Sequence, residues 1–242
     1  MFDTVKRWLG HAPVPISGWG ELAAWVRSRQ WTLRAVREPV GFVVDGQCGS
    51  TAWRLEWGPS QRSYISGGEL RLRAELSVPR ELQALVLGRE LMDHMEKAVF
   101  EQYVEGVQTR IDTTTPPEMR WLVMFPKLSG SELRTLRESY GALSSFKPWL
   151  QQWLSGKLTP TLAALPTSAE RPLVLMIARR RLCLRTAVAE PTPAALQAWL
   201  SVFECALQEA QRVKLDEIDF HAASTQPSLF SASTMPADAA RG

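Results

Sequence analysis

The chain has 242 residues, enough for one large domain or two small ones, and its 45% hydrophobic and 22% charged residues are typical of a folded globular protein. Its 28 basic and 25 acidic side chains leave a net charge of +3, so total charge alone is no argument for nucleic-acid or membrane binding. The three cysteines fit neither a disulfide framework nor a zinc motif, and no apolar run reaches the roughly 18 residues of a membrane helix. We therefore expect a cytoplasmic protein without a transmembrane segment.

The first half of the chain predicts helices, then strands, then one long helix. Residues 1–30 indicate two short N-terminal helices interrupted by prolines. Strands follow from residue 31, and the clearest is Glu69–Leu76, where apolar residues alternate with charged ones as in a half-buried antiparallel strand. Pro79 suits the first turn of a helix, and apolar spacing extends that helix to about Val104.

A Thr-Thr-Thr-Pro-Pro segment, residues 113–117, reads as a linker that separates a first half, 31–112, from a second half, 118–218. The second half opens with an apolar strand, Met119–Phe125, followed by a helical insert, 131–165. Ser129 and Glu132 form a capping-box pattern at the start of that insert.

The end of the chain predicts a hairpin, a helix and a tail. The hairpin strands are Leu173–Ala178 and Arg181–Val188, and Thr192-Pro193 opens a long helix that ends near Val213. Residues 222–242 are rich in Ser, Ala and Pro, so we expect a disordered tail. The fold class predicted is α+β, with antiparallel sheets packed against long helices in two similar β-β-α halves.

Two segments suggest an internal repeat. Glu69–Leu76 is followed by Pro79 and Leu82-Gln83-Ala84, and Arg181–Val188 is followed by Pro191 and Leu196-Gln197-Ala198. A duplicated strand–proline–helix unit explains the match, but any unit of that kind produces a similar pattern.

Catalytic signals are absent from the sequence. His11, His94 and His221 lie in no metal-binding or dyad pattern, and neither a nucleophile elbow nor a phosphate-binding glycine loop occurs. We therefore predict no catalytic residues, no metal and no cofactor. The ten tryptophans are expected in the core, or alternatively along a binding groove.

Arginines give the strongest binding signal. Strand alternation places them on the faces opposite the leucine and tryptophan rows, where planar guanidinium groups can bind carboxylates or phosphates. The predicted anion-binding residues are Arg34, Arg54, Arg71, Arg73 and Arg185. In the alternative interpretation, Glu56, Glu69 and Glu75 pair with these arginines on a merely solvated face.

The tail carries a short motif, Gln226-Pro227-Ser228-Leu229-Phe230. It resembles the pentapeptide with which many bacterial proteins bind the replication sliding clamp: Gln226, Leu229 and Phe230 match, whereas Pro227 stands where Leu is usual. The resemblance implies a bacterial protein whose tail binds a protein partner, and the alternative is a chance match.

Three functional classes follow. The first, which we favour, is a non-catalytic adaptor or chaperone-like protein that binds a protein partner. The second is a nucleic-acid-associated factor that uses the arginines and the tail, and the third is an enzyme with no recognisable motif.

Overall fold

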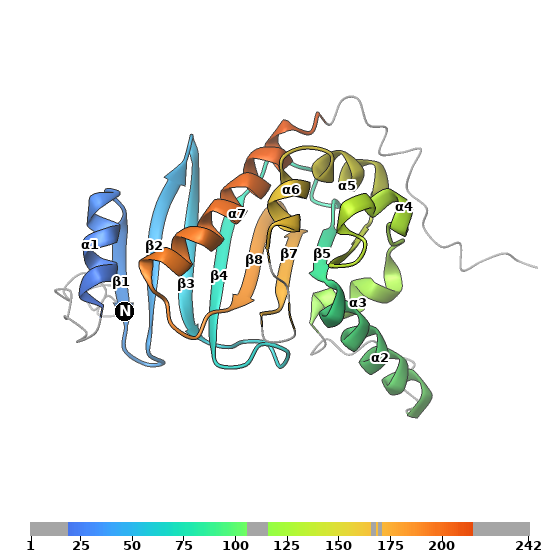
Figure 1. Cartoon of the computed structure of the whole chain (residues 1–242), viewed down its shortest axis with the longest axis horizontal. Coiled ribbons are helices and arrows are strands. Elements are labelled where there is room, and N and C mark those ends of the chain that lie inside the picture. The colour runs from blue at the N-terminus through green and yellow to red at the C-terminus, as the bar shows by residue number, and fades with distance from the viewer. Residues whose placement is uncertain (1–18, 106–115, 166–167, 169–170, 215–242) are drawn as a thin grey trace, which may run out of the picture.

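The computed structural model describes residues 19–105, 116–165, 168 and 171–214, and its centre is one eight-stranded antiparallel sheet (Figure 1). The strand order across the sheet is β1-β2-β3-β4-β8-β7-β5-β6. The strands are β1 (Thr32–Val36), β2 (Gly41–Cys48), β3 (Thr51–Pro59), β4 (Gly68–Glu75), β5 (Ala84–Gly88), β6 (Tyr140–Ser144), β7 (Leu173–Ala178) and β8 (Arg181–Ala187).

Helices pack on both faces of the sheet. They are α1 (Gly20–Ser28), α2 (Arg89–Glu105), α3 (Pro117–Met124), α4 (Gly130–Leu133), the 3-10 helix η2 (Arg134–Leu136), α5 (Lys147–Leu154), α6 (Leu158–Ala163) and α7 (Pro193–Arg212). Together with the sheet they confirm the predicted α+β class. None of the helices within the described residues is both long and apolar enough to cross a membrane.

The main core lies on the face covered by α1, α5, α6 and α7. Alternation in β4 turns Leu70 and Leu72 into this core, where they join buried leucines of α7 such as Leu200. Figure 1 shows α7 crossing this face diagonally, with α5 and α6 beside it. We call this side of the sheet the helix side.

A second, smaller core lies on the opposite face, where α2 and α3 cover β5, β6 and β7. Leu85 and Leu87 of β5 and Met176 of β7 pack there against Met92 and Trp121. Because β5 and β7 are covered on both faces, they are almost continuous apolar runs rather than alternating strands.

Two predicted elements are corrected by the structure. The helix expected from Pro79 begins only at Arg89, and Ala84–Gly88 forms β5 instead, because this apolar run is buried between β7 and β6. Met119–Phe125, expected as a strand, lies in and just after helix α3, which buries Trp121 and Leu122 against the second core.

The sheet also bears on the predicted halves. Strand β5 of the first half, 31–112, lies between β7 and β6 of the second, 118–218, so both halves contribute to one sheet. The insert 131–165 is not purely helical, because it contains β6. The internal repeat is not confirmed: Leu82-Gln83-Ala84 leads into a strand, whereas Leu196-Gln197-Ala198 lies within α7.

Candidate functional site

The five predicted arginines lie on one face of one sheet, opposite the main core. Arg34 is on β1, Arg54 on β3, Arg71 and Arg73 on β4, and Arg185 on β8. These arginines and the carboxylates among them, Asp45, Glu56 and Glu69, are here called the arginine face. The two helices on this side, α2 and α3, contact the sheet at β5 and β6, next to the arginine face.

Strand register places arginines directly opposite one another. Arg54 of β3 is the cross-strand partner of Arg73, and Arg71 of β4 is the partner of Arg185. Like charges opposite each other destabilise a sheet by several tenths of a kcal/mol or more. The face therefore depends on its carboxylates for stability.

Each carboxylate of the arginine face is shared by two arginines. Asp45 Oδ2 lies 2.6 Å from Arg34 Nη2, and Asp45 Oδ1 lies 2.6 Å from Arg54 Nε. Burial raises the pKa of Asp45, but the hydrogen bonds and charges of Arg54 and Arg34 outweigh burial and lower it. Asp45 thus stays ionised between the two guanidinium groups.

Glu56 and Glu69 repeat this arrangement further along the face. Glu56 lies 2.6 Å from Arg73 Nη2 and 3.4 Å from Arg71 Nε. Glu69, whose side chain is fully buried, lies 2.5 Å from Arg185 Nη1 and 3.4 Å from Arg71 Nη1. The backbone N–H of Gln61 also donates to Glu69, at 2.7 Å.

Exposure divides the arginines into two groups. Arg71 and Arg185 have side chains that are only 17% and 16% exposed, and both form ion pairs with the buried Glu69. Arg34, Arg54 and Arg73 are 48%, 40% and 40% exposed. These three present guanidinium groups to solvent and are the ones able to contact a partner.

A buried ionic cluster, which sequence reasoning missed, ties α3 to the loop between β3 and β4. Glu118 of α3 is fully buried and accepts hydrogen bonds from Arg62 Nε and from the Tyr64 hydroxyl, both at 2.5 Å. Burial, followed by the charge of Glu118 and its hydrogen bond, raises the pKa of Tyr64. No periodic pattern in the sequence relates Arg62 to Glu118, which lie 56 residues apart.

The other residues singled out in the sequence lie outside the described residues or elsewhere in the fold. The tail peptide with Gln226, Leu229 and Phe230 lies outside the described residues, as do His11 and His221. Cys183 lies on the outer side of β8 beside Arg73, and its burial raises the pKa of its thiol. Within the described residues no group of three or more His, Cys, Asp or Glu side chains is placed to hold a metal ion.

Comparison with known proteins gives a distant structural likeness. No family model matches the chain, and no curated protein matches it. The crystal structure of the mycobacterial trehalose monomycolate transport factor A, TtfA, is similar with 9% sequence identity and a TM-score of 0.48, over 78% of this chain and 92% of that one. A likeness at this level identifies neither a family nor an activity.

Proposed function

We propose that the protein is a non-catalytic binding protein that holds an acidic segment of a protein partner on the arginine face. The observation that carries this proposal is the excess of positive over negative side chains on the face. Five arginines share three carboxylates, and three of the five guanidinium groups are nearly half exposed.

The exposed guanidinium groups have hydrogen-bonding capacity to spare. Each guanidinium has five N–H donors in a fixed planar fork. Arg73 uses Nη2 toward Glu56, and Arg34 uses Nη2 toward Asp45. The remaining donors can bind Asp or Glu side chains of a partner in pairs, which is the geometry that favours arginine over lysine.

A protein segment fits this face better than a nucleic-acid backbone does. Asp45 and Glu56 lie between the exposed arginines, and their negative charges repel a continuous row of phosphates. A peptide can place its acidic side chains on arginines and its backbone N–H groups near the carboxylates. All three cysteines are free thiols, which supports a cytoplasmic setting for such a complex.

The test measures binding of a fluorescent glutamate-rich peptide by anisotropy across a salt series. The test variant combines Arg54→Gln with Arg73→Gln. The matched control combines Arg27→Gln with Arg137→Gln, which removes the same charge from α1 and from the chain after η2. We expect the test variant to weaken binding by about tenfold or more, since each charge-assisted hydrogen bond contributes about 1.5–3 kcal/mol.

Three outcomes would count against the proposal. The first is undetectable peptide binding to the parent protein at low salt. The second is an equal loss in both variants, which indicates a general charge effect. The third is tighter binding to single- or double-stranded DNA than to the peptide, with a steep salt dependence, which would favour the nucleic-acid-associated alternative.

A further inference from the structure

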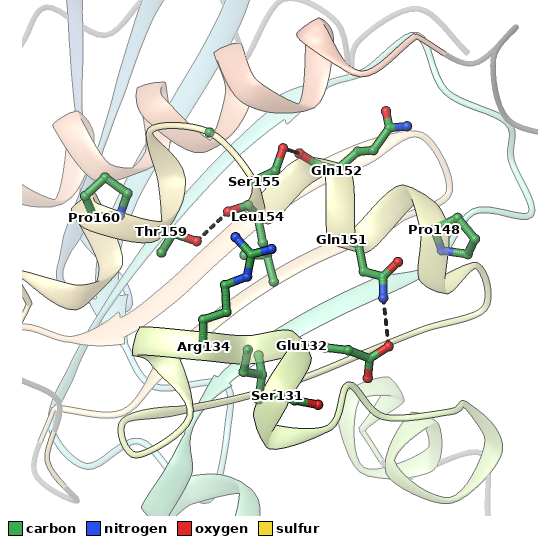
Figure 2. Close-up of a pocket in the computed structure, with 12 residues that line it drawn as sticks. Ser131, Glu132, Arg134, Pro148, Gln151, Gln152, Leu154, Ser155, Thr159 and Pro160 are labelled. Carbon is green, nitrogen blue, oxygen red and sulfur yellow. Dashed lines mark hydrogen bonds between the residues drawn. The ribbon is translucent and has the colours of Figure 1, made fainter.

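A groove lies on the helix side of the molecule, away from the arginine face. It is formed between α4, α5 and α6 and has a volume of about 750 Å³ (Figure 2). That volume falls within the roughly 300–1,000 Å³ typical of small-molecule sites. Its floor contains the buried side chains of Leu133 and Leu154, and Pro148 and Pro160 lie on its walls.

One cation in the groove has no partner among the residues that the structure describes. Arg134 follows α4, and Figure 2 shows its side chain extending into the groove toward Leu154 and Thr159. Its guanidinium makes no hydrogen bond or ion pair with any residue that the structure describes. By contrast, Glu132, the acidic residue of the groove, accepts from Lys147 at 3.1 Å and from Gln151 at 2.7 Å.

The backbone of Arg134 is in a conformation that favours glycine. Its φ is 53° and its ψ is −116°. L-residues with a side chain rarely adopt this combination, whereas glycine adopts it readily. Strained positions of this kind tend to coincide with functional sites. A bond from the Arg134 guanidinium to a ligand would offset part of this backbone cost.

Two hydroxyl groups of the groove, those of Thr159 and Ser155, direct their hydrogens into the protein. The Thr159 hydroxyl donates to the Leu154 carbonyl oxygen, and the Ser155 hydroxyl donates to the Gln152 carbonyl oxygen at 2.8 Å. Gln151 Nε2 donates a hydrogen bond to Glu132. What these residues keep for a ligand is acceptors: the oxygen lone pairs of both hydroxyls and the Gln151 side-chain carbonyl.

We propose that this groove binds a small molecule that combines one oxyanion with several hydroxyl groups, such as a sugar phosphate or a sugar acid. Arg134 binds the oxyanion through two parallel N–H bonds. The ligand hydroxyls donate to Thr159, Ser155 and Gln151. This site is independent of the arginine face and of the function proposed for it.

The test follows the side-chain amide signals of Gln151 and Gln152 by two-dimensional ¹⁵N NMR. Three probes are titrated in separate arms: glucose 6-phosphate, glucuronate and uncharged glucose. We expect the phosphate, the carboxylate or both to move these signals with saturation, and glucose to move them at least tenfold more weakly. The charged arm that saturates at the lower concentration identifies the preferred oxyanion.

Matched variants separate a built site from a general charge effect. Arg134→Gln should weaken binding of the charged probe at least tenfold. Arg137→Gln, which removes an exposed arginine three residues away that pairs with Glu138, should leave binding within twofold. The proposal is overturned if neither charged probe shifts the two amides, if glucose binds as well as they do, or if both variants lose affinity equally. Unchanged circular dichroism spectra confirm that each variant is folded.

Discussion

Among single residues, Glu69 is the most constrained part of the arginine face. Its carboxylate is fully buried and neutralises both Arg185 and Arg71 while accepting the Gln61 N–H. Glu69→Gln leaves two largely buried guanidinium groups, which lie directly opposite each other, without their shared anion. We expect a loss of about 3 kcal/mol in the free energy of unfolding, measured by urea denaturation.

Glu75→Gln is the control for this prediction. Glu75 also lies on β4 and pairs with an arginine, Arg181, at 2.6 Å, but its side chain is 66% exposed. Exposed pairs contribute about 0–1 kcal/mol, so this variant should unfold close to the parent protein. Similar losses in both variants would mean that burial does not determine the contribution of these carboxylates.

A second residue, Glu132, gives a prediction for pH dependence. Hydrogen bonds from the Ser129 backbone and hydroxyl, followed by the bond from Lys147, lower the pKa of Glu132 from 4.5 to about 2. Because the folded pKa lies below the unfolded one, this carboxyl stabilises the fold fully above pH 4.5. That contribution is lost as the pH falls from 4.5 to about 2.

The pKa of Glu132 can be measured by NMR titration of its side-chain carboxyl carbon. Ser129→Ala removes one of the two Ser129 bonds and should raise this pKa more than Lys147→Gln does, because the Ser129 hydroxyl bond lowers it more than the Lys147 bond does and the charge of Lys147 adds least. A larger rise in the lysine variant would contradict this order and assign the low pKa to charge rather than to the helix cap.

At the scale of elements, the sequence predicts the helices and strands that are buried on one face only. Strand β4 buries its leucines on one side only, so apolar and charged residues alternate along it. The alternation predicts both the strand and the face on which its arginines lie. Helix α7 begins with the Thr192 cap and Pro193, as its sequence indicates. The Ser129–Glu132 capping box is also confirmed, although the helix it starts, α4, is a single turn.

The type of an element that is buried on both faces cannot be predicted from alternation. All five residues of β5 are buried, so it has no period and merges with the apolar stripe of the following α2. Helix α3 is short, and Trp121 and Leu122 beside exposed Val123 and Met124 form an apolar run that resembles a strand. In both cases burial against other elements decides the secondary structure, and the local sequence does not indicate that burial.

The candidate site was predictable to the same extent. Alternation is a local property, and in the structure all five arginines lie on the sheet face opposite the main core. Their partners depend on register between strands: Asp45 lies opposite Arg54 across the β2–β3 hairpin, a pairing that no local pattern indicates. Exposure, which separates Arg73 from Arg71, depends on the loop after β3 and on Glu69, and neither is visible in the strand itself.

At the scale of the whole molecule, the strand order joins the two halves of the chain, 31–112 and 118–218. Strand β4 pairs with β8, and β5 lies between β7 and β6, so the sheet is continuous only when both halves are folded. Helix α7 adds contacts to α1, α5, α6 and β4. The main core therefore contains tryptophans from both halves, including Trp53 of β3 and Trp149 of α5.

This continuity predicts one cooperative unfolding transition for the described body of the protein. Incorporation of 5-fluorotryptophan gives a separate ¹⁹F NMR signal for each tryptophan, and Trp→Phe variants assign them. We expect the native signals of Trp53, Trp121 and Trp149 to disappear at the same urea concentration, because no half keeps its core without the other. Loss of the Trp149 signal while that of Trp53 persists would show instead that β1 to β4 form an independently stable unit.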